Sequence, residues 1–290
     1  MLSLVQTVAP PVEPITLVQA TNHLRVDAPE DFPNIQSYIS SARDYIERYI
    51  SKAIIQQQWT LGLNAFPFAQ FNSYSMSSRR YVEDFYINKA MAIFIPRPPL
   101  VSVQSITYVD GSGAPQTLDP TSYVVDGSVE PGQIVPSTGV FWPYPQAFTP
   151  NTVKINFTAG YPNVTITEND NVPALSPYSF ALANQNIFGI TSVSYSTGGA
   201  LTLVNGAPAP GQYSYSAGTI TVNSADKGKT LVVVYQTYQI PPAITQAMLL
   251  LVTKMYLQRT PEIKDNANLD NAIHSLLAKV DSGIIGYNHD

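Results

Sequence analysis

Few side chains in this sequence combine the residue types and spacing that catalysis or metal binding requires. The three histidines, His23, His274 and His289, lie far apart and lack the spacing of metal ligands. Cysteine is absent, which excludes a thiolate nucleophile, a disulfide and a cysteine-based metal site. The motifs typical of phosphate-binding loops, serine hydrolases and zinc proteases are also missing. We therefore expect a protein that is not an enzyme, with no catalytic residue, metal or cofactor.

Two small charged groups are the remaining candidates for chemistry. Glu168 and Asp170 could ligate Ca²⁺, but the glycine and distant glutamate of an EF-hand loop are missing, so we interpret this run as an Asn- and Asp-rich turn. Arg79 and Arg80 could touch DNA phosphates in a channel. A solvated loop, or a salt bridge to a neighbouring molecule, is the simpler interpretation of the two arginines.

Trp142 is a candidate contact with a partner protein. It lies in the proline-flanked run Phe141-Trp142-Pro143-Tyr144-Pro145, which reads as a loop. A large ring in such a loop predicts an exposed contact surface.

The composition favours contacts with protein over contacts with nucleic acid or lipid. Charged residues make up 12% of the chain, about half the usual share, and there are 18 tyrosines and 24 prolines. The net charge of -5 argues against non-specific binding to nucleic acid, although it permits a wall past which DNA moves. The longest strongly apolar run, 247–252, is too short to span a bilayer, so we expect no membrane partner.

Hydrophobic periodicity predicts helices near both ends of the chain and strands between them. Helices are expected over 17–24, along a stripe that runs from Ile35 to Tyr49, from Pro242, and over 269–280. From Ile54 onward the period is two, which is typical of short strands.

The helix that begins at Pro242 is apolar on nearly all sides. Leu249, Leu250 and Val252 make its second face apolar, so this helix must be covered on more than one side. We expect a neighbouring copy of the chain to cover that face.

Both chain ends are expected to order on a partner. Residues 1–14 read as an extended, proline-containing arm, and the tail 283–290 exposes Ile284, Ile285 and Tyr287. Neither segment can bury itself, so both are candidates for docking on another protein.

The β-rich middle of the chain contains two stretches whose short runs follow one another in the same order, which suggests an internal repeat. The matched pieces are Ser105-Ile106-Thr107-Tyr108 with Ser192-Val193-Ser194-Tyr195, Tyr123-Val124-Val125 with Tyr213-Ser214-Tyr215, Gly132-Gln133-Ile134 with Gly218-Thr219-Ile220, and Val153–Phe157 with Leu231–Tyr235. Two interpretations stay open. Either a β-module was duplicated, or short strands joined by tight turns look alike.

These patterns predict an α+β fold with a helical bundle core, a β-region and an inserted all-β, sandwich-like module. The expected core spans 15–162 and 239–282, and the expected insert spans 163–238.

The order of several short runs resembles the head–tail connector (adaptor) proteins of tailed bacteriophages. The runs are Ile15-Thr16-Leu17, His23-Leu24-Arg25-Val26-Asp27, Glu47-Arg48-Tyr49, Gln58-Trp59-Thr60-Leu61, Ile95-Pro96-Arg97-Pro98-Pro99-Leu100, Ala159-Gly160-Tyr161 and Pro242-Ala243-Ile244. The resemblance covers about 15–161 and 240–257, and the β-insert departs from it.

The resemblance implies a structural virion protein at the head–tail junction, assembled in the host cytoplasm. It implies a ring of about twelve copies that extends the DNA channel. Its partners would be the portal, on which we expect the tail 283–290 to dock, a downstream head–tail joining or tail protein, and double-stranded DNA that passes without sequence recognition. The alternative is a tail or decoration protein that binds a host-surface glycan through its β-module.

Overall fold

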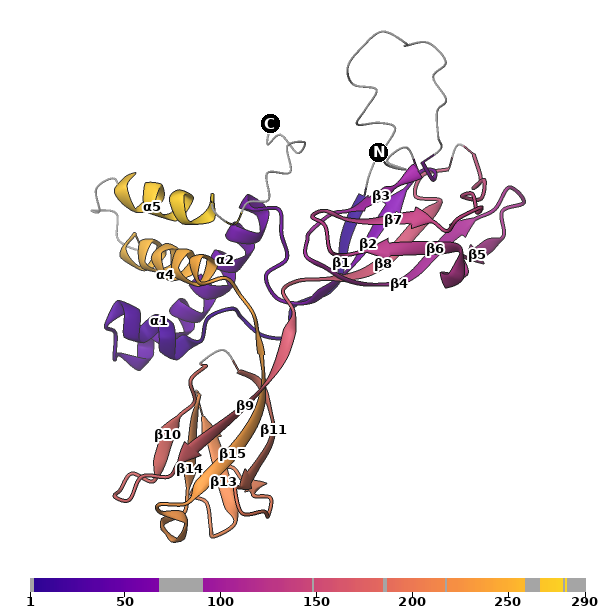
Figure 1. Cartoon of the computed structure of the whole chain (residues 1–290). Helices are drawn as coiled ribbons and strands as arrows, with labels where there is room; N and C mark the ends of the chain where they lie inside the picture. The colour runs from indigo at the N-terminus through magenta and orange to yellow at the C-terminus, as the bar shows by residue number, and fades with distance from the viewer. Residues whose placement is uncertain are drawn as a thin grey trace, which may run out of the picture. The chain divides into compact units, whose positions relative to one another are not determined.

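The computed structural model describes residues 3–67, 91–147, 149–184, 187–216, 218–258, 267–278 and 280 (Figure 1). Two compact units divide the chain. The first contains the residues up to Pro11 and 50–161, and the second contains Val12–Tyr49 and 162–280. The helices and the β-region of the core expected over 15–162 and 239–282 fall in different units, and the division into core and insert stays a prediction.

The second unit contains the helices of the described chain. They are α1 (Leu17–Leu24), α2 (Phe32–Tyr49), α4 (Pro242–Leu257) and α5 (Ala267–Leu277), with the short 3-10 helix η1 (Pro29–Asp31). Thr16 caps α1, because its hydroxyl accepts from the N–H of Gln19 while the Gln19 side chain accepts from the Thr16 N–H.

The helices pack through the stripes that the sequence predicted. Ile35, Ile39 and Ile46 of α2 are buried, as are Ile244 and Leu251 of α4. Two polar contacts add to this packing: Tyr256 Oη donates to Asp31 at 2.7 Å, and Lys254 pairs with Asp270 at 2.5 Å.

The first unit is built from two sheets that enclose one apolar core. The five-stranded sheet has the order β1-β2-β8-β4-β5, and the three-stranded sheet has the order β3-β7-β6. The strands are β1 (Ser3–Val8), β2 (Gln57–Leu63), β3 (Ile93–Ile95), β4 (Leu100–Val109), β5 (Pro115–Thr117), β6 (Tyr123–Asp126), β7 (Gly132–Pro136) and β8 (Val153–Ala159), with the 3-10 helix η3 (Pro120–Ser122). Alternate residues such as Leu61, Ile106 and Ile155 point into the core, as strand periodicity requires.

A second β-module lies in the other unit, between β8 and α4 in sequence. Its sheets have the orders β10-β14-β13-β12 and β11-β15-β9. The strands are β9 (Asn163–Asn171), β10 (Ser179–Ala181), β11 (Ile187–Tyr195), β12 (Thr202–Leu203), β13 (Gln212–Ser216), β14 (Thr219–Val222) and β15 (Thr230–Tyr238), with the 3-10 helix η4 (Ser224–Asp226). Asn163 and Tyr238 are paired residues, so the module begins and ends at neighbouring positions.

The two β-modules share one plan of strand pairing. In the first unit β8 lies between β2 and β4, and β7 lies between β3 and β6. In the second module β15 lies between β9 and β11, and β14 lies between β10 and β13. All of these pairs are antiparallel.

The irregularities of the two modules coincide as well. The β4–β8 register shifts between Leu100 and Ser102 and again between Val103 and Ser105. The β11–β15 register shifts at the corresponding places, between Ile187 and Gly189 and between Ile190 and Ser192. Bulges are specific local features and do not follow from strand alternation alone. The shared bulges therefore support duplication over a chance likeness of short strands.

The prediction of a helical bundle core is wrong. Of the described residues, 37% lie in strands, arranged in four sheets, and 26% lie in helices. The fold is α+β or mainly β. The long helical stripes gave stronger sequence signals than the short strands, although the strands are more numerous. No described helix is long and apolar enough to cross a membrane.

Candidate assembly surfaces

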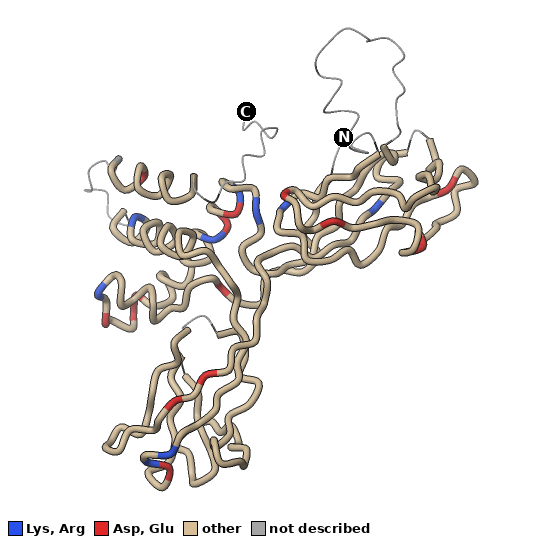
Figure 2. Tube along the Cα trace, in the orientation of Figure 1, with Lys and Arg blue, Asp and Glu red and all other residues tan. Residues whose placement is uncertain are grey.

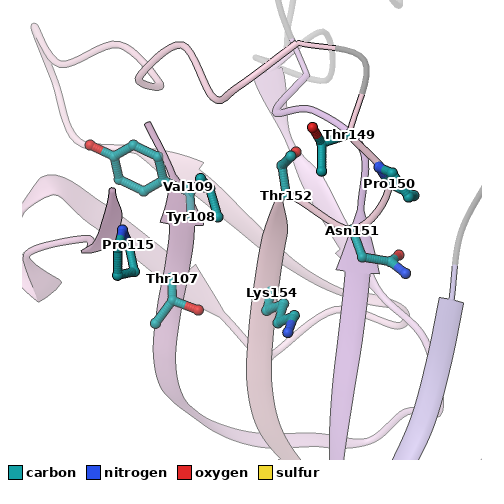
Figure 3. Close-up of a pocket in the computed structure, with 9 residues that line it drawn as sticks. All are labelled: Thr107, Tyr108, Val109, Pro115, Thr149, Pro150, Asn151, Thr152 and Lys154. Carbon is teal, nitrogen blue, oxygen red and sulfur yellow. The ribbon is translucent and has the colours of Figure 1, made fainter. Parts of the chain in front are cut away.

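A pocket of the first unit lies at one end of the five-stranded sheet (Figure 3). It encloses about 500 Å³ and is lined by Thr107, Tyr108, Val109, Pro115, Thr149, Pro150, Asn151, Thr152 and Lys154. Lys154 of β8 supplies the single cation of this lining, beside threonine hydroxyls and the Asn151 amide. Such groups can hold an anionic side chain of a partner.

An aromatic loop, Val140–Gln146, lies beside the β4–β5 hairpin, where Pro145 pairs with Asp110. Its exposed rings are Phe141 and Tyr144, which keep 78% and 80% of their surface. The loop is fixed at its end because the Gln146 N–H donates to the carbonyl of Val109 at 2.8 Å. An exposed, preorganised pair of large rings is typical of a protein contact.

Trp142 does not lie on the surface as predicted. It is 3% exposed, its ring stacks on Phe66 with centroids 5.0 Å apart, and its Nε1–H donates to the carbonyl of Met91 at 2.7 Å. The prediction of an exposed Trp142 is wrong because its ring packs on Phe66, whereas the neighbouring rings of Phe141 and Tyr144 are exposed. Trp142 anchors the loop that presents Phe141 and Tyr144.

The predicted contact face of α4 is divided by the structure. Val252 is 1% exposed and is buried within a single chain, which contradicts its assignment as a partner contact. Leu249 and Leu250 are half-buried and keep surface for a neighbour. Their contact with another copy stays a prediction. Tyr45 and Tyr49 of α2 are also exposed, and the Tyr49 ring stacks on the His274 ring with centroids 5.1 Å apart.

Several predicted contacts lie outside the described residues. These are the candidate DNA contacts Arg79 and Arg80, and the tail residues Ile284, Ile285 and Tyr287. Within the arm 1–14, Ser3–Val8 form strand β1 and pair with β2 of the same chain, and bends follow at residues 11, 12 and 14.

Glu168 and Asp170 lie in strand β9, so their prediction as part of a turn is wrong. Both side chains are on the face that Ile166 turns toward the module's core. Glu168 accepts from Tyr235 Oη at 2.7 Å and from the Ala183 N–H at 3.0 Å. Burial, followed by the repulsion of Glu168, raises the pKa of Asp170.

Charged groups are sparse on both modules, as Figure 2 shows. Asp226 is a buried exception, held by Tyr195 Oη and Lys229 Nζ at 2.8 Å each. Within the described ranges, no group of three His, Asp or Glu side chains could hold a metal ion. The tyrosines Tyr213, Tyr235 and Tyr238 of the second module are buried and leave their rings unavailable for stacking on a sugar.

Solved structures of virus-like particles contain chains of similar fold. A chain described as part of the virion of a native gene transfer agent (GTA) particle aligns with a TM-score of 0.51 at 14% identity, over 95% of this chain and 93% of that chain. Chains from the neck of the empty GTA particle, computed with C6 symmetry, and from the neck of the native GTA particle, computed with C12 symmetry, align with TM-scores of 0.49 and 0.47. Their identities are 14% and 15%, and each alignment covers 94% of both chains. No protein-family profile and no curated protein matches the sequence. The chain therefore shares its fold, over nearly its whole length, with a chain of the GTA virion.

Proposed function

We propose that this chain is a structural protein of a phage or phage-like virion, located in the neck between head and tail. The observation that carries the proposal is the fold shared with a GTA virion chain over 95% of the sequence. The ordered runs that resemble head–tail connectors point to the same role independently. The proposal assigns the chain no catalytic step.

In the proposed neck, copies of the chain form a closed ring beneath the portal. Such a ring needs two different surfaces on each copy, because its contacts are heterologous. The aromatic loop Val140–Gln146 and the half-buried Leu249 and Leu250 are candidates for these surfaces. The portal, the next tail-side protein and passing DNA are the proposed partners, and ring number is left to measurement.

Electron microscopy of the purified full chain tests this proposal, alone and mixed with the portal protein of the same particle. Light scattering after size exclusion gives the mass of each species. We expect rings, or rings that form once the portal is added. A chain that stays monomeric and ignores the portal would overturn the proposal. Binding of that monomer to a glycan array would favour the host-recognition alternative.

The tail provides a sharper test of portal contact. Replacing Ile284, Ile285 and Tyr287 with serine should weaken portal binding at least tenfold, because about three apolar side chains lose their burial. Replacing Asn288 and His289 with serine is the matched control and should leave binding unchanged. Equal binding by both variants contradicts docking through the tail.

A further inference from the structure

The second β-module has an open position where the first has a strand. In the first unit β1 pairs antiparallel with β2, and Leu4 lies opposite Leu61. The strand equivalent to β2 is β9, and among the described residues no strand pairs with the outer edge of β9. The duplicated plan therefore contains one filled strand position and one empty one.

The strand that borders the empty position, β9, carries two acidic residues. Glu168 occupies the place of Leu61, since Glu168 pairs with Val233 as Leu61 pairs with Ile155. By the same pairing Asp170 occupies the place of Leu63. A strand added to β9 would set alternate side chains beside these two carboxylates.

Asp170 is incompletely satisfied in the chain alone. Its Oδ2 is buried and receives no donor from the described residues, and its neighbour Glu168 is a second carboxylate, with which it forms a hydrogen bond only when the pair holds a proton. Glu168, in contrast, is engaged by Tyr235 Oη and the Ala183 N–H. A buried carboxylate oxygen without a partner is costly, and a donor brought by a ligand would remove that cost.

We propose that the outer edge of β9 is a docking site for an extended strand of another protein, antiparallel to β9, with lysine or arginine at alternate positions. Main-chain hydrogen bonds along β9 supply the binding, and the basic side chains opposite Glu168 and Asp170 supply the selectivity. A second copy's β1 does not fit this site, because it would place the apolar Leu4 opposite Glu168.

Fluorescence anisotropy with the full chain tests the site. The probe is a labelled peptide of about seven residues in which lysine and valine alternate. We expect it to bind, and we expect the same peptide with glutamate for lysine, or with a central proline, not to bind. Hydrogen exchange should then show protection of the β9 amides that do not bond to β15.

The variant Glu168→Gln with Asp170→Asn should weaken peptide binding at least tenfold, since about two charge contacts are lost. Asp119→Asn with Asp126→Asn removes the same charge from the first unit and should leave binding unchanged. The single Asp170→Asn variant keeps the test usable if the double variant fails to fold.

Three results would overturn the proposal: no binding of the lysine peptide, binding without protection of β9, or equal binding by the charge-neutral variant. If the neutral variant instead self-associates through β9, the carboxylates serve to guard the edge against other copies. None of these outcomes depends on whether the chain forms a neck ring.

Discussion

The two β-modules have the same strand pairing but treat the same core position in opposite ways. Leu61 of the first unit is fully buried among apolar neighbours, whereas its counterpart Glu168 is a carboxylate bound by a tyrosine hydroxyl. β1 covers the strand of Leu61, and the described chain leaves the strand of Glu168 open. The comparison teaches that a duplicated framework can be kept while one edge changes from a paired strand with apolar side chains to an open strand with half-buried carboxylates.

The loops differ in the same sense. Residues 137–152 join β7 to β8 and carry the aromatic loop, whereas residues 223–229 join β14 to β15 with only a 3-10 turn. The first unit thus presents apolar rings at this place, and the second presents a compact polar corner around Asp226.

The largest expected effect comes from placing a carboxylate in the first module at the position that Glu168 has in the second. Leu61→Glu should reduce the free energy of unfolding of the first unit by about 4–5 kcal/mol, because the new carboxylate is buried without a donor. Urea unfolding followed by tryptophan fluorescence reports this unit selectively, since both tryptophans, Trp59 and Trp142, lie in it. Gln58→Glu, at an exposed position of the same strand, is the control and should change stability little.

Removing the anchor of the aromatic loop should have the next largest effect. Trp142→Ala deletes a buried ring and is expected to cost about 3–4 kcal/mol in the same urea experiment. Phe141→Ala removes an exposed neighbour and should stay within about 0.5 kcal/mol. Equal losses from the two substitutions would contradict the assignment of anchor and display roles.

Replacing a glycine tests a further difference between the modules, at the end of the central strands β8 and β15. Gly160 has φ +136°, and a Cβ there would lie 2.6 Å from backbone atoms of Ile55 and Gln56, so Gly160→Ala should cost about 2–3 kcal/mol. The next module places Tyr238 at the equivalent end of β15. Gly139→Ala also has a positive φ but meets open space, so it should cost less.

The smallest effects concern pH, and the two modules should respond with opposite signs. The raised pKa of Asp170 means that its contribution to stability is present below the unfolded pKa and is lost as pH rises through the folded pKa. Hydrogen bonds from Ser112, then Gln116 and Ala114, lower the pKa of Asp110 to about 2, so its contribution is present above the unfolded pKa and is lost as pH falls toward 2.

Hydrogen exchange measured separately in each module, across the acidic range, checks these signs. Asp170→Asn should remove the pH dependence from the second module, and Asp110→Asn should remove it from the hairpin of the first. A pH response of the same sign in both modules would contradict the two environments described for these aspartates.

The sequence predicted the helices and the repeat better than it predicted the fold class or the contact surface. Ile35, Ile39 and Ile46 repeat with a helical period along the 18 residues of α2, so their burial could be predicted from the sequence. The repeat could be recognised because the equivalent strands β4 and β11 carry similar runs that include Tyr108 and Tyr195. The open edge of β9 could not be predicted, since Glu168 and Asp170 are residue types that favour turns. Only the pairing of β9 with β15 shows that they lie in a strand. The inward turn of Trp142 depends on Phe66 and Met91, which are distant in sequence.

The paired ends of the second module also have an evolutionary and practical consequence. Asn163 faces Tyr238 across one rung of the sheet, and the Gln239 N–H donates to the carbonyl of Pro162 at 3.0 Å. A segment whose two ends are already hydrogen-bonded neighbours can be lost, gained or exchanged in one genetic event, with little strain on the flanking chain. Such a cassette offers a natural place to insert a foreign domain into this chain.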